Sequence, residues 1–179
     1  MTIAEHEMNA PIEFDANSPD AQKIRKQVLS RAGLSAFMVA KLPLAFVAGL
    51  RVTELDATRC SVRVPYRWRT TNPFRSTYFA ALAMAAEMST GALGLSLVRA
   101  APVPMSILIV EMTGKFVKKA TDVSTFTCED GHLFEAAIIQ ALTSEDGASC
   151  SATTVGRNNA GEEVATFTFT WSFRKKKAR

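Results

Sequence analysis

The sequence predicts an α+β fold in which a curved antiparallel sheet wraps around one long central helix. Three observations lead to this prediction. Residues Thr77–Val98 have helical character and are apolar on nearly every side, so this helix belongs inside the protein. Strand-like segments then follow with a single helix among them, as in antiparallel sheets. The last of them, Glu163–Arg174, alternates between apolar and hydroxyl side chains, which is typical of a strand with one buried face.

An N-terminal helical arm, residues 18–49, is expected ahead of the sheet. Ser18 can cap a helix that starts at Pro19, and Gly33 is expected to end this helix. Ser35 can cap a second, short helix that is bent or ended by Pro43. The arm therefore consists of two predicted helices.

The chain is predicted to form a single domain, residues 18–174, which includes the arm. Residues 1–17 are expected to be a flexible lead-in, and the first nine have no apolar run of the kind that a secretory signal needs. Residues 175–179 are expected to be a solvated basic tail.

The other predicted elements are short. Asp130 can cap a helix that runs to about Ala141, and an Asn-rich turn at 158–161 joins the last two strands. The predicted strands are 50–55, 60–66, 105–119 with a bend near Gly114, 121–128, 147–156 and 163–174.

Composition narrows the function classes. The chain has 179 residues, 47% hydrophobic, and a formal net charge of +4, which fits one folded domain and shows no nucleic-acid signature. The most apolar early stretch, 34–50, is broken by Lys41 and Pro43, so no membrane span is expected there.

The cysteines and histidines indicate neither a disulfide framework nor a metal. Cys60, Cys128 and Cys150 are widely spaced, which favours buried free thiols in a reducing compartment, and we expect a cytoplasmic protein. His6 and His132 lie far apart without ligand-forming neighbours, so neither a metal nor another cofactor is expected.

Glu87 is the residue that most invites a functional interpretation. It lies in the middle of the apolar helix, one turn from Ala83 and Gly91. Burying a carboxylate there costs folding free energy unless it has a partner, reaches solvent or serves a function. Apolar surroundings also raise its pKa toward that of a general base at neutral pH. The alternative is a structural carboxylate paired with an arginine: Arg67, Arg69 or Arg75.

The loop before this helix has its own candidates. Asn72 can offer an amide N–H to a carbonyl oxygen, although Asn before Pro is also an ordinary turn signal. Arg67, Arg69 and Arg75 form a basic cluster that can meet phosphate groups, but a solvated or salt-bridged loop is the favoured interpretation. Trp68, between the first two, can stack on a base, but anchoring the loop to the core is the favoured interpretation.

The segment 72–91, NPFRSTYFAALAMAAEMSTG, resembles the active-site stretch of hotdog-fold acyl-CoA thioesterases of the phenylacetate-pathway type, and most closely the uncharacterised, thioesterase-like clade of that superfamily. The family pattern has an Asn, a Gly–Thr, a His six residues after the Asn, two small residues, and an acid fifteen residues after the Asn. Asn72 and Glu87 hold the Asn and acid places with this spacing. Ser76 stands for the Thr, and Ala80 and Ala81 stand for the small pair.

The resemblance implies a hotdog fold and roles for these residues. Glu87 would act as the nucleophile or activate water, and Asn72 would position the substrate or the water. Backbone N–H groups at Ala80 and Ala81 would polarise the thioester carbonyl with help from the helix dipole. The sequence departs from the pattern at Tyr78, which replaces the His, at Arg75, which replaces the Gly, and at the Pro that follows the Asn. Arg75, Ser76 and Tyr78 are accordingly expected at the substrate.

Three hypotheses follow. The first is an enzyme that hydrolyses an acyl-CoA thioester, with coenzyme A as part of the substrate and no separate cofactor. The second is a non-catalytic hotdog protein that binds a fatty-acyl or other apolar ligand, which the departures favour. The third, a dehydratase or hydratase, ranks last because that chemistry usually pairs a His with the acid.

The resemblance also implies self-association. Hotdog subunits pair as a homodimer or a dimer of dimers, with their sheets joined and the site between subunits. Asn72 and Glu87 of one site would then come from different chains.

Overall fold

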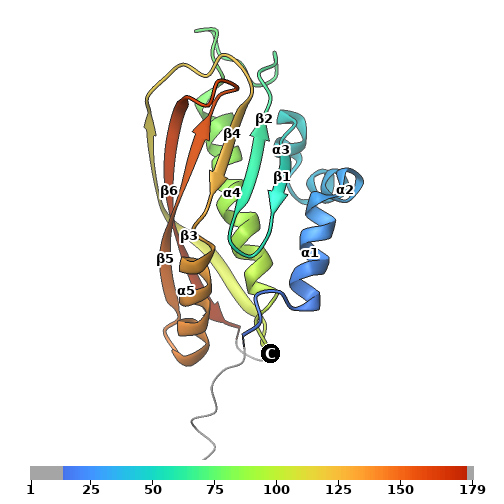
Figure 1. Ribbon diagram of the computed structural model, residues 1–179, viewed down its shortest axis with the longest axis vertical. Helices are drawn as coiled ribbons and strands as arrows, with labels where there is room; N and C mark the ends of the chain where they lie inside the picture. The colour runs from blue at the N-terminus through green and yellow to red at the C-terminus, as the bar shows by residue number, and fades with distance from the viewer. Residues whose placement is uncertain (1–13, 177–179) are drawn as a thin grey trace, which may run out of the picture.

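The computed structural model, which describes residues 14–176, confirms the predicted α+β architecture (Figure 1). Six strands form one antiparallel sheet in the order β1-β2-β4-β5-β6-β3, and this curved sheet wraps around helix α4. The helices are α1 (Pro19–Leu29), α2 (Arg31–Lys41), α3 (Pro43–Ala48), α4 (Phe79–Val98) and α5 (Gly131–Thr143). The strands are β1 (Arg51–Leu55), β2 (Cys60–Val64), β3 (Met105–Phe116), β4 (Ser124–Cys128), β5 (Ala148–Arg157) and β6 (Glu163–Lys175).

Helix α4 is the centre of the core. Among the described residues it alone is long and apolar enough to cross a bilayer, but 67% of its most apolar window is buried inside the protein, so it is a core helix. Two of its buried hydroxyls have partners in the sheet: Ser89 donates to Thr154 of β5 at 2.8 Å, and Thr90 accepts from the Trp171 indole at 3.1 Å. The predicted central helix is confirmed, with its first residue at Phe79 rather than Thr77.

Strand β6 supplies the aromatic half of the core. Its predicted apolar face is confirmed, because every large side chain on that face is buried against α4 or its neighbouring strands. The rings of Phe167 and Phe169 stack with centroids 6.2 Å apart, and Phe134 of α5 meets Phe173 edge-on at 6.0 Å. The residues of this face are Ala165, Phe167, Phe169, Trp171 and Phe173.

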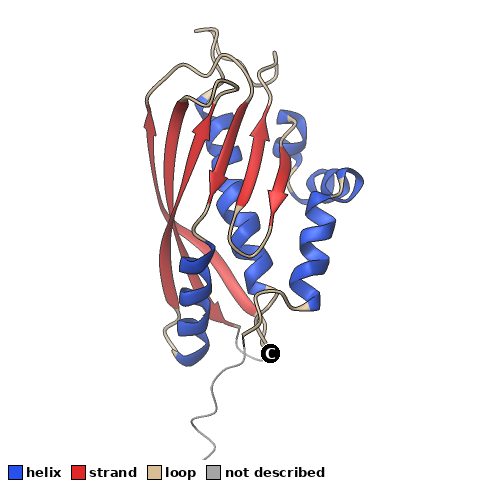
Figure 2. Cartoon of the chain, in the orientation of Figure 1, coloured by secondary structure: helices blue, strands red, loops and turns tan. Residues whose placement is uncertain are grey.

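The arm consists of three helices rather than two, and the predicted break between the first two was wrong. Ser30 ends α1 and also caps α2, because its hydroxyl accepts a hydrogen bond from the N–H of Gly33 at 3.3 Å. Gly33 and Ser35 therefore lie inside α2 instead of ending and starting helices. Pro43 occupies the first turn of α3, where its missing N–H costs nothing. Figure 2 shows these helices grouped beside β1, away from α5.

Arg25 fixes α1 onto the core. Its side chain is only 6% exposed, and its guanidinium donates to Ser96 of α4, to the Asn17 side chain and to the carbonyl of Ala16 at distances of 2.8–3.3 Å. Burial lowers the pKa of Arg25, while the nearby Asp56 and Asp15 raise it. The arm is thus attached through a buried, hydrogen-bonded cation.

The two edges of the sheet differ. Edge strand β1 has five residues and an irregular register between Val52 and Glu54, and α1 packs beside it. Edge strand β3 has twelve residues, and apolar side chains along it face solvent, with Leu108 65% exposed. Its register shifts between Ile109 and Glu111, earlier along the strand than the position near Gly114 where a bend was predicted.

The helix after β4 begins beyond Asp130 as predicted, but this residue does not cap it. The Asp130 carboxylate instead accepts from the N–H of Thr153 on β5 at 2.7 Å, which ties the helix start to the sheet. The three cysteines are free thiols, with Cys60 and Cys128 buried. The lead-in prediction for residues 1–13 and the tail prediction for 177–179 lie outside the described residues, as does His6.

Candidate active site

One face of α4 is not covered by the sheet. Half-exposed side chains recur along it at helical spacing from one end of the helix to the other, whereas the other faces are buried. Glu87 lies in the middle of this open face. The half-exposed residues are Ala80, Ala83, Met84, Glu87, Gly91, Ala92 and Leu95.

The Glu87 carboxylate has no hydrogen-bond or ion-pair partner among residues 14–176. The interpretation that it pairs with an arginine of the preceding loop is therefore not borne out within this chain. Burial raises its pKa, and no neighbouring cation offsets that cause. Gly91 makes room for it, since a Cβ there would lie 2.9 Å from Oε1 of Glu87 and 3.3 Å from the Trp171 ring. An unpartnered carboxylate in apolar surroundings is suited to accept a proton near neutral pH.

The loop between β2 and α4 is organised by Asn72. Its Oδ1 accepts from the N–H of Phe74 at 3.0 Å, and from the N–H and hydroxyl of Ser76, both at 3.2 Å. The Asn72 N–H donates to the Ser76 carbonyl at 2.9 Å, and the N–H of Arg75, which adopts a φ of 56°, donates to the Asn72 carbonyl at 3.0 Å. The amide oxygen of Asn72 is thus committed to the loop. Its NH₂ group makes no hydrogen bond within the described chain.

The start of α4 presents free backbone donors, but not the expected pair. The Ala81 N–H already donates to the Tyr78 carbonyl at 2.9 Å. The N–H groups of Phe79 and Ala80 have no acceptor within residues 14–176, and Tyr78 provides no side-chain cap. The two donors that can polarise a carbonyl are therefore those of Phe79 and Ala80.

A groove of about 510 Å³, the loop groove, lies between this helix start and the end of β3. Asn72, Ser76 and Tyr78 line it, as predicted side chains of the site, whereas Arg75 is exposed beside it. Sequence reasoning missed the apolar and basic wall: Phe79, Leu82, Phe116, Lys118 and Lys119. Their positions at a helix start and a strand end were visible in the sequence, but that these two ends meet was not.

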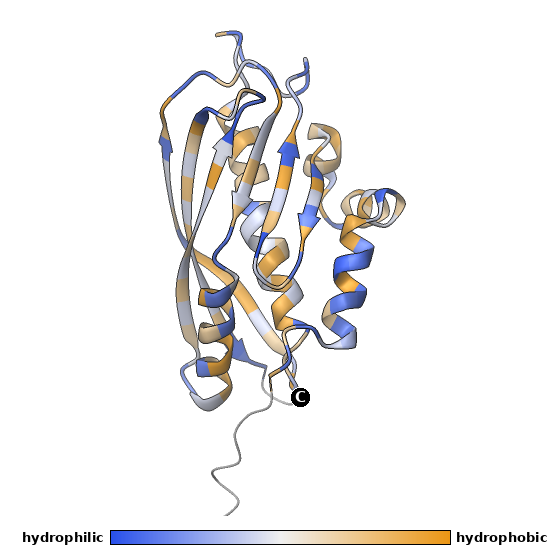
Figure 3. Ribbon diagram, in the orientation of Figure 1, coloured by the Kyte–Doolittle hydropathy of each residue, from blue (hydrophilic) through white to orange (hydrophobic). Residues whose placement is uncertain are grey.

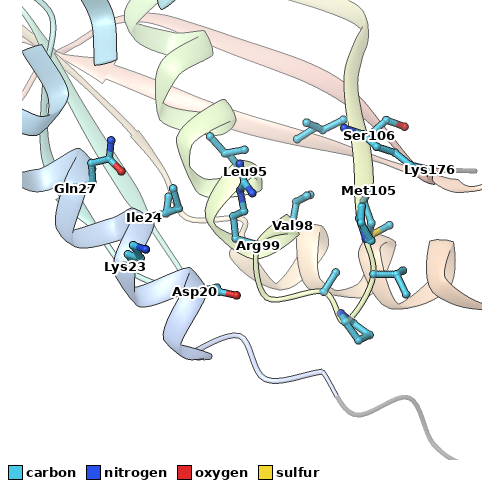
Figure 4. A pocket seen from close by; sticks show the side chains of 15 residues that line it. Asp20, Lys23, Ile24, Gln27, Leu95, Val98, Arg99, Met105, Ser106 and Lys176 are labelled. Atoms are coloured by element: carbon cyan, nitrogen blue, oxygen red, sulfur yellow. The ribbon is translucent and has the colours of Figure 1, made fainter. Parts of the chain in front are cut away.

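A second groove of about 770 Å³, the arm groove, lies at the other end of α4 (Figure 4). Leu95 and Val98 of α4 form its floor, Ile24 of α1 lies on one side, and the start of β3 from Met105 lies on the other. Both grooves thus adjoin α4 and edge strand β3, one at each end of the open face.

A single chain does not bring Asn72 and Glu87 together in one pocket. Asn72 lines the loop groove, while Glu87 lies eight residues beyond Phe79, which is about 12 Å along a helix. Glu87 is equally far, eight residues, from Leu95 of the arm groove. The predicted pair therefore lies on one open surface but at separate points of it.

The interpretation of Trp68 as an anchor to the core was wrong. Its side chain is 85% exposed, and Arg67 and Arg69 on either side are exposed as well. The loop anchors itself through Thr70, whose buried hydroxyl bonds the Pro65 carbonyl at 2.6 Å. Across residues 14–176, no three His, Cys, Asp or Glu side chains gather as a metal site requires.

The family model that matches this chain is described as a domain of unknown function, DUF4442, and it spans residues 30–173. The chain belongs to the DUF4442 family. No curated protein matches the sequence significantly.

Several of the solved structures that resemble the chain are named as thioesterases or probable thioesterases. A protein of unknown function from Pseudomonas aeruginosa, named a probable thioesterase, is 21% identical with a TM-score of 0.69, over 84% of this chain and 99% of that one. A thioesterase from Haemophilus influenzae is 11% identical with a TM-score of 0.64, over 84% and 94%. A thioesterase family protein from Silicibacter pomeroyi is 19% identical with a TM-score of 0.59, over 82% and 100%.

These likenesses confirm the hotdog fold. The chain shares the fold of these solved structures, with α4 as its central helix. The finer resemblance to phenylacetate-pathway enzymes stays a prediction.

Proposed function

We propose that this DUF4442 protein hydrolyses an acyl-CoA thioester, with Glu87 as the general base or nucleophile. The observation that carries the proposal is the Glu87 carboxylate itself. It is the acid of the open α4 face, it has no partner within the described chain, and burial raises its pKa. A structural carboxylate would have a donor.

In the general-base form of the reaction, the Glu87 carboxylate takes a proton from water as the water oxygen attacks the thioester carbonyl carbon. The carbonyl π electrons move onto oxygen, where the free N–H groups of Phe79 and Ala80 at the α4 start of the second chain of a dimer stabilise the negative charge. The C–S bond then breaks, and coenzyme A leaves as a thiolate that takes up the proton. In the nucleophilic form, a Glu87 oxygen attacks the carbonyl carbon and the C–S bond breaks, so that coenzyme A leaves as a thiolate. Water then hydrolyses the resulting anhydride to the free acid, which restores the Glu87 carboxylate and provides the proton for the thiolate.

The proposal includes a homodimer through β3. An edge strand with twelve residues and exposed apolar side chains is a ready template for another strand. Antiparallel pairing of two β3 strands would set the start of one against the end of the other, and so the arm groove of one chain beside the loop groove of its partner. Asn72, through its free NH₂, then acts on substrate held by the partner's Glu87.

The first test measures release of free coenzyme A from short, long and aromatic acyl-CoAs, with wild type, Glu87→Ala and Glu87→Gln side by side. We expect wild type to hydrolyse part of this panel and both variants to lose at least about a hundredfold in kcat. The kcat/KM of wild type should fall on its acidic side at a pH above 4.5, because burial raises the pKa of Glu87 above that ordinary value. Equal background rates in all three proteins would remove the enzyme assignment.

The second test concerns assembly. Val110→Lys places a charge on the exposed β3 edge, so we expect it to turn a dimer into a monomer by light scattering and to abolish hydrolysis. Ile139→Lys on the exposed side of α5 is the matched control and should leave both unchanged. A wild-type monomer at all concentrations would contradict the composite site.

A second function has its own support. The amide oxygen of Asn72 is occupied by its own loop, and Ala80 adds a methyl group beside the free N–H groups. Both features suit a non-catalytic hotdog protein that binds a fatty-acyl or other apolar ligand. The same panel separates the two, since a binding protein holds acyl ligands without releasing coenzyme A. In either case we propose a cytoplasmic protein that acts on a small molecule, without a metal, a further cofactor or a nucleic acid.

A further inference from the structure

The N-terminal arm presents an apolar face to solvent. In α3 the two alanines, Ala45 and Ala48, are buried against the domain, while the larger Leu44, Phe46 and Val47 are exposed, Leu44 by 73%. This arrangement is the reverse of an ordinary surface helix, whose large apolar side chains face inward. In Figure 3, α2 and α3 are mostly orange, whereas α1 beside them is mostly blue.

Trp68 extends this face. The loop that carries it runs beside the end of α3, since a Cβ on Gly49 would lie 3.4 Å from Cγ of Pro65 and 4.0 Å from Nη2 of Arg69. Figure 1 shows the segment between β2 and α4 projecting beyond the sheet at the α3 end of the molecule. We call the combined feature the arm surface. Its exposed apolar side chains are Val39, Leu42, Leu44, Phe46, Val47 and Trp68.

The arm surface is purely cationic. Residues 31–51 and residues 65–79 each contain three Lys or Arg and no Asp or Glu. Lys41, Arg67 and Arg69 are exposed, and none of them forms an ion pair within the described chain. A surface that combines bare apolar side chains with unpaired cations attracts a partner that is both apolar and anionic.

We propose that the arm surface docks the protein onto a bilayer of anionic phospholipid. Aliphatic side chains and a tryptophan at such a surface enter the boundary between headgroups and acyl chains, where the indole ring is favoured. Cations beside them stay with the phosphates, and each adds to binding when the lipid is anionic. Leu44 and Phe46 would insert into the boundary of the acyl chains, and Trp68 would anchor the loop at the interface. Arg67 and Arg69 would be attracted to the lipid phosphates.

The charge pattern argues against a second copy of the chain on this surface. A two-fold contact places the same patch on both sides, so the cations of one arm would face those of the other without an acid between them. A bilayer provides the opposite charge. The inference concerns peripheral attachment of the whole protein and does not depend on thioester hydrolysis.

The test uses the full chain and its own fluorescence. The protein has two tryptophans, and Trp171 is 5% exposed in the core, so any change in emission on vesicle addition comes from Trp68. We expect a blue shift and co-flotation with phosphatidylcholine vesicles that contain about 30% phosphatidylglycerol, and little of either with phosphatidylcholine alone. Salt at about 0.5 M should release the protein.

Matched variants separate the contribution of the cations to vesicle binding from that of the apolar side chains. Arg67→Gln with Arg69→Gln should lower the vesicle partition coefficient about thirtyfold, while Lys23→Gln with Lys26→Gln on α1, which removes the same charge elsewhere, should leave it within about threefold. Leu44→Ser should lower it about tenfold, and Ile139→Ser on α5 should have no effect. Thermal unfolding of every variant should match wild type, because each altered side chain is exposed.

Three results would overturn the proposal. One is the absence of binding by wild type to the anionic vesicles. Another is binding by the Arg67/Arg69 variant that equals binding by the Lys23/Lys26 variant. The third is a loss of oligomer mass in Leu44→Ser by light scattering, which would assign the arm surface to a second copy of the chain.

Discussion

Two ionisable side chains that lose solvent at α4, Arg25 of α1 and Glu87 of α4 itself, have different surroundings. Arg25 reaches the C-terminal half of the helix and makes hydrogen bonds to a hydroxyl, an amide and a carbonyl. Glu87, in the middle of the same helix, makes none within the described chain, although it is half-buried. A buried charge whose hydrogen-bonding groups are all paired has a structural role, because leaving those buried donors unpaired would cost free energy. A carboxylate held without partners is destabilising in the folded chain and is retained for another purpose.

The largest effect on stability is expected at Arg25. Arg25→Met removes the buried donors and leaves Ser96, Asn17 and the Ala16 carbonyl without their bonds, so we expect a loss of about 3 kcal/mol in the free energy of unfolding. Urea denaturation measures it. Lys26→Met, the exposed neighbour on α1, should stay within about 0.5 kcal/mol. Equal losses of stability in both variants would show that the hydrogen bonds of Arg25 do not hold α1 to the core.

Two glycines of α4 sharpen the contrast between its faces. A Cβ at Gly94 would lie 2.9 Å from the Phe134 ring and 3.1 Å from Ile107, so Gly94→Ala should cost about 2 kcal/mol of stability and spare activity per folded molecule. A Cβ at Gly91 meets chiefly the flexible end of Glu87. Gly91→Ala should therefore change stability by less than about 1 kcal/mol, while displacement of the carboxylate lowers kcat about tenfold. Denaturation curves and the coenzyme A assay together separate the two outcomes, and unchanged activity in Gly91→Ala would contradict the role of Glu87.

The smallest effect is a pH dependence of stability. Because burial raises the pKa of Glu87 in the folded chain above its ordinary value near 4.5, the stability that its protonated form provides is complete below that value and is lost as pH rises through the raised pKa. Glu87→Gln has no such loss. The free energy of unfolding of the variant, measured by urea denaturation, should therefore rise relative to that of wild type as the pH increases from about 4.5 to 8. If the variant instead becomes less stable relative to wild type at pH 8, a partner chain must donate a stabilising hydrogen bond to Glu87.

The sequence predicted those parts of the fold whose side-chain period is strong. Helix α4 is apolar on nearly every side, and β6 alternates from Ala165 to Phe173, so both elements were found. The break between α1 and α2 was missed, because Ser30 acts as a cap only through the hydrogen bond to Gly33 that the folded arm provides. Local capping patterns at Ser18 and Ser30 look alike in the sequence.

The site was predictable in part for a similar reason. A single acid in an apolar helix marks Glu87 directly, since its cost is evident from residue types alone. The loop residues were less accessible. Trp68 points to solvent and the amide oxygen of Asn72 bonds its own loop, and both facts depend on a backbone path with a positive φ at Arg75. No periodic pattern encodes such a path.

The unequal edges of the sheet set a limit on how far strand-to-strand growth can proceed. If two chains pair through β3, both outer edges of the joined sheet are β1 strands, each five residues long, irregular in register and flanked by α1. Neither can template a third chain, so the addition terminates at a closed pair. In such a dimer the long β3 edge would be fully paired in one step, and assembly through sheet edges would stop at two chains.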